Sequence, residues 1–219
     1  MPKRRQDGAP EWARLYEMAE PQGGYVTTAQ AHEAGYSNPL LNYYVREGRL
    51  KRAARGIYRL AYFPAGDNED LVVVWLWSGQ EGVFSHETAL ALYELSDALP
   101  HGKHLSVPSS WRPRRLRVPR GTELYYADID QDQRAWAGPV PVTKPLRTVV
   151  DCAKAESDLG LVEQAIEQGL ARGLFGKEEL RRALVDEELH GLLPMLRPRT
   201  RGRRRFTHPG RVRSKRTVK

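Results

Sequence analysis

Residues 37–60 read Ser-Asn-Pro-Leu-Leu-Asn-Tyr-Tyr-Val-Arg-Glu-Gly-Arg-Leu-Lys-Arg-Ala-Ala-Arg-Gly-Ile-Tyr-Arg-Leu. They predict a helix of about ten residues with Asn38 as N-cap, because Pro39 suits the first helical position, where its missing N–H costs nothing. Gly48 ends this helix, and Leu50 and the run 57–60 then predict two paired strands around a basic tip. This order is typical of the recognition helix and wing of a winged helix-turn-helix.

The residues before this stretch predict two further helices. Residues 11–20 carry apolar side chains at helical spacing, and Pro21 and the following glycine pair end that helix. Thr27 and Gln30 form a capping box ahead of a helix from about 28 to 34, which Gly35 ends. Two helices joined by a tight glycine-containing turn have the helix-turn-helix geometry, which places the second helix in the major groove. A three-helix module for protein contacts is the alternative.

The predicted recognition helix carries the candidates for contact with DNA bases. Asparagine can bind adenine, and arginine can bind guanine, with two hydrogen bonds each. The candidates are Asn38, Asn42, Tyr43 and Arg46. The candidates for the DNA backbone or the wing are Thr28, Gln30, Lys51, Arg52 and Arg55, the last three at the tip of the hairpin. Thr28 and Gln30 are alternatively caps, and Arg55 alternatively pins the wing.

The rest of the chain predicts a second domain of mixed composition. We expect helices at 69–77 after Asn68 and at 86–95 after Ser85, strands at 104–107, 116–118, 122–126 and 139–142, and helices at 145–153 after Thr143, 161–170 and 177–185. The predicted fold class is α+β: a flexible N-terminus (1–10), a winged helix-turn-helix domain (11–63), a mixed α/β C-terminal domain (68–190) and a disordered arginine-rich tail (197–219).

The distribution of charge favours a polyanionic partner. Residues 1–66 hold 10 Lys/Arg and 6 Asp/Glu, residues 67–196 hold 14 and 21, and residues 197–219 hold 11 and none. Basic ends on an acidic middle indicate DNA as the partner. Cys152 is the single cysteine, which excludes an internal disulfide framework and a cysteine-based zinc site. No apolar run approaches the roughly 20 residues of a membrane span, and no signal region follows the N-terminus, so we expect a cytoplasmic protein.

Several other motifs invite a functional interpretation. Arg112, Arg114, Arg115, Arg117 and Arg120 form a second basic patch, which either extends a DNA footprint, binds RNA or phosphate, or is a solvated surface. His86 and the Asp128–Asp132 segment lack the partners of a nucleophile or a calcium loop and are interpreted as structural. Arg147 and Asp151, four residues apart, predict a helical ion pair. We therefore expect no catalytic residues, no metal and no cofactor.

Four motifs in this order resemble the AbiEi family, the antitoxins of type IV toxin–antitoxin systems. They are the helix-turn-helix, Arg55-Gly56-Ile57-Tyr58-Arg59-Leu60, Ser85-His86-Glu87-Thr88-Ala89-Leu90 and Val142-Thr143-Lys144-Pro145-Leu146-Arg147-Thr148-Val149-Val150-Asp151. The resemblance covers roughly residues 11–186. It implies a non-enzymatic repressor that binds inverted repeats in its own promoter as double-stranded DNA. It also implies a nucleotidyltransferase-like toxin, countered without a tight complex.

Two other functions stay open from the sequence. One is an orphan winged-helix regulator whose C-terminal domain senses a ligand or a partner. The more distant one is a metal-dependent nuclease or nucleotidyltransferase that uses Asp128 and Asp130. For the oligomeric state, we expect that a monomer in solution is compatible with two copies on the inverted repeats.

Overall fold

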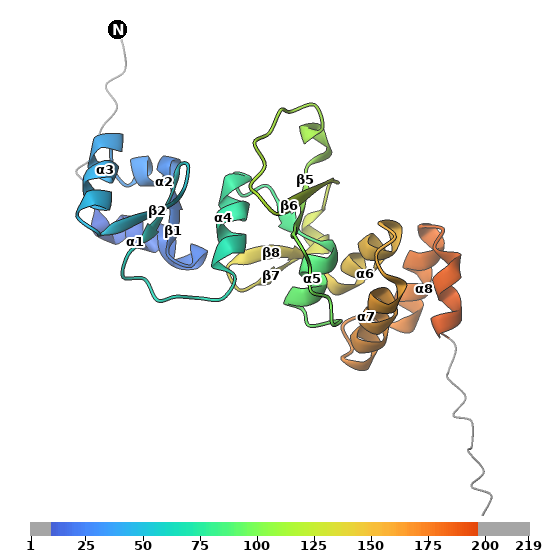
Figure 1. Ribbon diagram of the computed structural model, residues 1–219. Helices are drawn as coiled ribbons and strands as arrows, with labels where there is room; N and C mark the ends of the chain where they lie inside the picture. The colour runs from blue at the N-terminus through green and yellow to red at the C-terminus, as the bar shows by residue number, and fades with distance from the viewer. Residues whose placement is uncertain (1–9, 197–219) are drawn as a thin grey trace, which may run out of the picture.

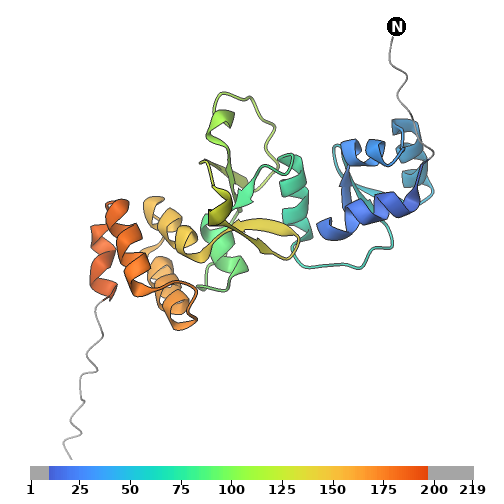
Figure 2. The same ribbon diagram turned by 180° about the vertical axis from the view of Figure 1, so that it is seen from behind.

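The computed structural model describes residues 10–196, which form three parts arranged in a row (Figure 1). An N-terminal module of helices and a small sheet stands at one end, a five-stranded sheet lies in the middle, and a group of helices forms the other end. Figure 2 shows the same arrangement from behind. The predicted α+β class, with a helix-turn-helix followed by a mixed α/β part, is confirmed. The predictions for residues 1–9 and for the tail 197–219 lie outside the described residues.

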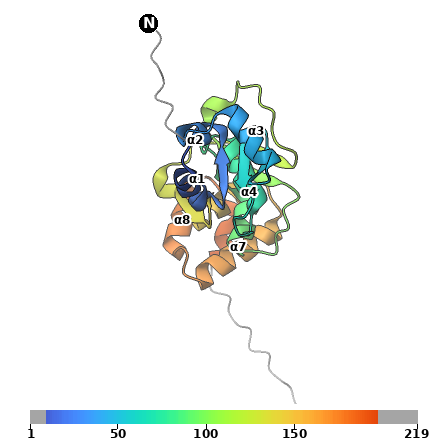
Figure 3. The ribbon, with the colours of Figure 1, turned by 90° about the vertical axis from the view of Figure 1, so that its left-hand side faces the viewer.

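The N-terminal module is a three-helix unit with a β-hairpin. Its helices are α1 (Trp12–Ala19), α2 (Thr28–Glu33) and α3 (Asn38–Arg46). Strands β2 (Leu50–Ala54) and β3 (Ile57–Leu60) form the predicted hairpin, and β1 (Tyr25–Thr27) pairs with the other edge of β3. Figure 3 views the molecule from this end. The capping box is confirmed, since Thr27 Oγ1 accepts from the Gln30 N–H at 3.2 Å and Gln30 Oε1 accepts from the Thr27 N–H at 2.9 Å.

Two details of this module differ from the prediction. The N-cap of α3 is Ser37, so Asn38 and Pro39 occupy the first two helical positions. Lys51 and Arg52 lie within β2, opposite Arg59 and Tyr58, and only Arg55 lies at the turn. The predicted N-cap position is wrong by one residue, because serine and asparagine are both favoured at an N-cap and stand next to each other here. The predicted position of Lys51 and Arg52 was wrong because β2 already starts at Leu50. Two consecutive exposed basic residues are more typical of a turn than of a strand.

The central sheet has the strand order β6-β5-β4-β8-β7 and is mixed. Its strands are β4 (Val83–Phe84), β5 (Lys103–Val107), β6 (Thr122–Tyr126), β7 (Arg134–Ala137) and β8 (Val140–Thr143). β5 pairs with β6 and β4 with β8 in parallel, whereas β4–β5 and β7–β8 are antiparallel. The strand predicted at 116–118 is wrong, because this segment packs through Leu116 against the hydrophobic core and does not pair with the outer edge of β6. Strands β4 and β7 were not predicted.

Helices lie on two sides of the sheet (Figure 1). Helix α4 (Glu69–Trp77) stands between the N-terminal module and the sheet, and α5 (His86–Leu92) leads to the C-terminal group (Figure 1). That group contains α6 (Pro145–Lys154), α7 (Leu159–Ala171), α8 (Lys177–Asp186) and a final turn at His190–Leu196. All five predicted helices are present. The N-cap of α6 is Lys144 rather than Thr143, whose hydroxyl lies 2.7 Å from that of Thr148.

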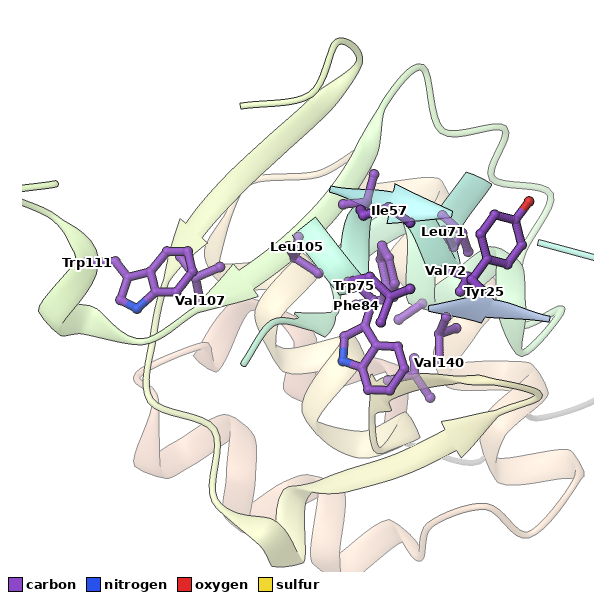
Figure 4. Close-up of a cluster of buried hydrophobic side chains, with 14 residues drawn as sticks. Tyr25, Ile57, Leu71, Val72, Trp75, Phe84, Leu105, Val107, Trp111 and Val140 are labelled. Carbon is purple, nitrogen blue, oxygen red and sulfur yellow. The ribbon is translucent and has the colours of Figure 1, made fainter. Parts of the chain in front are cut away.

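The N-terminal module and the sheet share one hydrophobic core, which we call the shared core (Figure 4). Tyr25 and Ile57 from the module pack with α4, and α4 packs in turn with the sheet residues Phe84 and Val140. A helix that is apolar on all sides is expected where it is buried on all sides. Two further clusters lie within α1–α3 with the hairpin, and among α5–α8. Within residues 10–196, no helix is both long and apolar enough to cross a membrane.

Candidate nucleic-acid interface

Helix α3 is held by its inner face. Leu41 is fully buried, and Tyr44 and Val45 are partly buried against the cluster formed by α1–α3. The Tyr44 ring lies 6.1 Å from Trp12 and 5.6 Å from Tyr36, measured between ring centroids. Because residues three and four apart share a face of a helix, this packing fixes which side chains point outward. Gly48, with a φ of 71°, ends the helix and turns the chain into the hairpin.

The outer face of α3 carries all four predicted base-contact residues. Asn38, Asn42, Tyr43 and Arg46 are exposed, and the Tyr43 side chain is 47% accessible. Asn38 Oδ1 lies 3.0 Å from Nε2 of His32 on α2, so its side chain is oriented by the preceding helix. Among residues 10–196, Asn42 and Arg46 have no hydrogen bond or ion pair to their side chains. The structure therefore brings together one asparagine, one tyrosine and one arginine that are free to contact a ligand.

The wing candidates divide into free and engaged side chains. Lys51, Arg52 and Arg55 are exposed, and no intramolecular partner is found for them in the described part of the chain. Thr28 Oγ1 donates to the Gly56 carbonyl at 3.2 Å, which joins the hairpin turn to the start of α2. Gln30 serves the capping box and also donates from Nε2 to Gln22 Oε1 at 3.1 Å. Phosphate contacts by Thr28 or Gln30 stay a prediction.

Two arginines that the sequence did not single out organise the module. The Arg49 guanidinium lies 4.4 Å from the ring centroid of Trp12 and 4.9 Å from that of Tyr44, which fixes the chain after α3. Arg59 Nη2 donates to Glu69 Oε1 at 2.7 Å, and the Tyr25 hydroxyl donates to Glu69 Oε2 at 3.0 Å. No sequence signal marks these pairs, because the partners lie on different elements.

The carboxylate of Glu69 is the polar link between the module and α4. Burial raises its pKa, but the hydrogen bonds from Tyr25 and Arg59 outweigh burial, so the pKa of Glu69 lies below its ordinary value. Burial and then the same hydrogen bond raise the pKa of Tyr25 to about 12. Both groups therefore keep their charge states at neutral pH, with Glu69 ionised and the phenol protonated. The orientation of the module on α4 is thus fixed by a charged hydrogen bond beside the shared core.

The second basic patch lies on the connection between β5 and β6. Arg112, Arg114, Arg115, Arg117 and Arg120 are all exposed. Figure 1 shows this connection as a long loop that rises above the sheet. The patch is separate from α3 in the sequence and lies on a different part of the molecule.

His86 sits in a buried polar cluster at the start of α5. Its ring stacks on Tyr125 at 3.6 Å between centroids, and its Nδ1 lies 2.9 Å from Ser85 Oγ, which accepts from Ser106 Oγ at 2.7 Å. Burial, followed by the charges of His104 and Arg147, lowers the pKa of His86 from 6.5 to about 4. The ring is therefore neutral at pH 7. These contacts agree with the structural interpretation of His86.

The acidic motifs are also placed by the structure. Asp128 Oδ1 accepts from the Ser109 N–H at 3.1 Å, so this side chain joins the segment after β6 to the turn Ser109–Trp111 after β5. In the part of the chain that the structure describes, no group of three or more potential metal ligands is found. The predicted ion pair is confirmed, with Arg147 Nε 2.7 Å from Asp151 Oδ1. Arg147 also donates to Gln133 Oε1 at 2.8 Å, which ties α6 to the turn before β7.

Comparison with known proteins agrees with this geometry. Residues 14–61 match the family model described as "Transcriptional regulator, AbiEi antitoxin", which confirms the predicted family for this segment. The match covers the helix-turn-helix and the hairpin; the motifs at 85–90 and 142–151 lie outside it. None of the curated proteins matches the chain.

A solved structure has a similar fold. It is the crystal structure of the RV2827C protein from Mycobacterium tuberculosis, with a TM-score of 0.50 and 16% sequence identity. The likeness covers 84% of this chain and 76% of that chain. It therefore extends beyond the N-terminal module into the mixed α/β part.

Proposed function

We propose that this protein is the antitoxin of a type IV toxin–antitoxin system that binds inverted repeats in its own promoter and represses its operon. The DNA-binding part of the proposal is carried by one observation: the outer face of α3 presents Asn42, Tyr43 and Arg46 with no internal polar partner for Asn42 or Arg46 within residues 10–196. The family match over residues 14–61 supports the same assignment.

The chemistry of this face suits sequence-specific binding. Asparagine and arginine bind base edges in the major groove with two hydrogen bonds each, which distinguishes one base pair from another. Lys51, Arg52 and Arg55 on the wing supply positive charge beside the helix, as contact with phosphates requires. Residues 37–60 contain six Lys/Arg and one acidic residue, Glu47. This surface therefore attracts DNA and can also select a sequence.

Repression follows from where the protein binds. Two copies on inverted half-sites occupy the promoter and exclude the polymerase from it. A winged helix-turn-helix dimer site requires half-sites on one side of the duplex, separated by about one helical turn or a multiple of it. The proposed partner, a nucleotidyltransferase-like toxin countered without a tight complex, rests on the resemblance to the AbiEi family.

The DNA-binding part is tested by gel shift with the promoter fragment upstream of the coding sequence. We expect binding in the range of about 10⁻⁸ to 10⁻¹¹ M at physiological salt, and much weaker binding when both inverted repeats are scrambled. The Asn42→Ala/Arg46→Ala variant should bind both fragments alike. Equal affinity of the wild-type chain for the native and the scrambled fragment would contradict the proposal.

The antitoxin part is tested by genetics. We expect the adjacent open reading frame to encode a nucleotidyltransferase-like protein that stops growth when expressed alone. Co-expression of the full chain should restore growth. Restoration by an α3 variant that no longer binds DNA would show that neutralisation does not depend on DNA binding. Continued growth arrest with the wild-type chain present would contradict the antitoxin assignment.

A ligand-sensing regulator is the second candidate, and one observation favours it. An open pocket of about 600 Å³ lies where the N-terminal module, the linker and the β7–β8 turn meet, lined in part by Tyr25, Glu69 and Pro139. A ligand bound there would contact both parts of the protein. This candidate predicts that a small molecule raises the unfolding temperature and changes promoter affinity together, and that no toxin gene lies beside the coding sequence.

A further inference from the structure

The loop between β5 and β6 concentrates positive charge on an otherwise acidic part of the protein. Its residues 112–120, which we call the arginine loop, hold five arginines and no acidic residue. The other residues between 67 and 196 hold 9 Lys/Arg and 21 Asp/Glu. A charge so unevenly distributed is typical of a contact with a polyanion rather than of a surface that only needs to be solvated.

The arginine loop is anchored at several points along its length. Trp111, immediately before it, is buried in the shared core, and Leu116, at its middle, packs against the same core. The guanidinium of Arg112 lies 5.3 Å from the ring centroid of Tyr126, and that of Arg114 lies 4.5 Å from the ring centroid of Trp111. Two of the five arginines therefore hold the loop in shape through their contact with aromatic rings.

The other three arginines have no role within the protein. Arg115, Arg117 and Arg120 are exposed, and the described residues offer them no hydrogen bond, ion pair or ring contact. A fixed loop with free guanidinium groups is pre-organised for phosphate, which arginine binds with two parallel hydrogen bonds. Little conformational entropy of the backbone is lost when such a loop binds.

The arginine loop and α3 lie on the same side of the molecule. Both reach the upper side in Figure 1, and the end-on view of Figure 3 shows both toward the upper right. The link between them is rigid, because α4 packs on the module through Tyr25 and Ile57 and on the sheet that carries the loop. A duplex that lies along this side can meet both.

We propose that the arginine loop binds the phosphate backbone of the same DNA duplex that α3 contacts, beyond the half-site that α3 reads. The inference rests on the proposed function and adds a second contact to it. Because phosphates carry no sequence information, the arginine loop contributes affinity and orientation, and α3 contributes the choice of sequence. Each chain then covers more DNA than a winged helix-turn-helix module alone.

The test removes the three free arginines together and keeps the two that anchor the loop. The variant is Arg115→Ala/Arg117→Ala/Arg120→Ala in the full chain, and its affinity for the promoter fragment is measured between about 50 and 300 mM salt. Two or three lost phosphate contacts should reduce the slope of log K against log salt by about 2–3, since each contact contributes about 0.9. At 0.15 M salt, the same relation predicts roughly 30-fold weaker binding for two lost contacts and roughly 170-fold for three. The preference for native over scrambled repeats should not change.

The matched control removes three positive charges from the opposite end of the molecule. Lys177, Arg181 and Arg182 are exposed on α8, away from α3 (Figure 1). The Lys177→Ala/Arg181→Ala/Arg182→Ala variant should keep the wild-type salt slope. Hydroxyl-radical footprinting should show backbone positions outside the half-site that the wild-type chain protects and the arginine-loop variant does not. Both variants should keep the wild-type unfolding temperature, which shows that they fold.

The possible failures can be told apart. A wild-type chain without promoter preference would overturn the proposed function. Normal promoter preference with the same salt slope in wild type, arginine-loop variant and control would overturn the arginine-loop proposal alone. If the arginine-loop variant instead lost binding to single-stranded RNA of the same length and kept wild-type DNA binding, the arginine-loop proposal would also be overturned. The loop would then be assigned to RNA.

Discussion

Arg46 is the single residue on which the proposed DNA contact depends most, because it combines full charge, exposure and the absence of an intramolecular partner within residues 10–196. We predict that Arg46→Ala weakens binding to the promoter by about 1–3 kcal/mol and relaxes the base preference at one position of each half-site. The measurement is a competition gel shift against fragments with single base changes.

The control for Arg46 is Arg14→Ala. Arg14 is also exposed and has no partner in the described residues, but it lies on α1. Its removal should change affinity little and leave every base preference in place. If the two variants weaken binding equally at all sites, Arg46 acts through its charge and does not read a base.

His86 gives the protein a defined sensitivity to acid. Its pKa is about 4 in the folded protein against 6.5 for an ordinary histidine, because burial disfavours its charged form. Between these two values the unfolded chain binds a proton and the folded chain does not, so stability falls as the pH falls through this window. We predict that His86 alone lowers the free energy of unfolding by about 2 kcal/mol between pH 7 and pH 5. Urea unfolding at both pH values measures this.

The matched variant is His86→Asn, which keeps a hydrogen-bonding nitrogen near Ser85 and does not titrate in this range. The variant should be less stable than the wild type at pH 7 and should lose less stability on acidification. An identical pH dependence in both proteins would show that the acid sensitivity comes from carboxylates instead.

At the residue scale, the sequence predicted exposure better than partners. Helical periodicity correctly predicted that Asn42, Tyr43 and Arg46 are exposed, because the buried face that contains Leu41 sets the orientation of α3. It could not show that Gln30 bonds Gln22, nor that Arg59 bonds Glu69. These contacts depend on how separate elements pack, and local sequence does not encode that. Base contact by the α3 residues stays a prediction.

Helix α7 contains a glycine, Gly169, at a position where the packing leaves no room for a side chain. A Cβ on Gly169 would lie 2.2 Å from the tip of the Phe175 ring, which is buried. An alanine inside a helix is ordinarily more stable than a glycine by about 0.5–1 kcal/mol. We predict the opposite sign here: Gly169→Ala lowers the free energy of unfolding by about 1–3 kcal/mol, as overpacking does. Urea unfolding of the full chain measures the change.

A double-mutant cycle with Phe175→Leu separates packing from helix propensity. The smaller side chain removes the clash, so Gly169→Ala should cost less, or stabilise, in the Phe175→Leu background. Additive effects of the two substitutions would contradict the packing explanation.

At the element scale, the glycines that end helices were reliable signals, whereas N-cap positions were off by one residue at α3 and α6 and strand signals were less reliable. Gly35 and Gly48 ended α2 and α3 as predicted, because a left-handed position after a helix favours glycine. The apolar alternation at 116–118 resembles that of a strand, but Leu116 packs against the shared core from an irregular connection instead of pairing with the outer edge of β6. β4, with two residues, is too short to give a periodic pattern.

For the molecule as a whole, the link through Glu69 couples the N-terminal module to the rest. We predict that Glu69→Ala lowers the free energy of unfolding by about 1–3 kcal/mol, because Arg59 and Tyr25 lose a charged hydrogen-bond acceptor. Limited proteolysis in the linker 61–67 should become faster, since the module is then held by the apolar contacts and by the hydrogen bond from Gln80 Nε2 to Gln22 Oε1. Asp67→Ala, which removes an exposed neighbouring carboxylate, should change neither quantity. Unchanged proteolysis in Glu69→Ala would show that the remaining contacts hold the module without Glu69.

At this scale the sequence predicted two domains with a boundary between residues 63 and 68, and the structure shows a core that crosses it. The available signal was the composition of residues 69–77, which are apolar almost throughout. A helix at the edge of an independent domain would be amphipathic. The absence of a polar face on α4 indicates that other elements pack on it from two sides. The sequence could not show that Tyr25 and Ile57 are among the residues that pack there.

The position of α4 in the chain has a consequence for how the protein is made. Residues 10–60 leave the ribosome before α4 does, so Tyr25 and Ile57 remain without their apolar partners until residues 69–77 have been translated. At about 5–20 residues per second, this delay is roughly one to three seconds. The nascent N-terminal module therefore completes its packing only after the first helix of the following part has been synthesised.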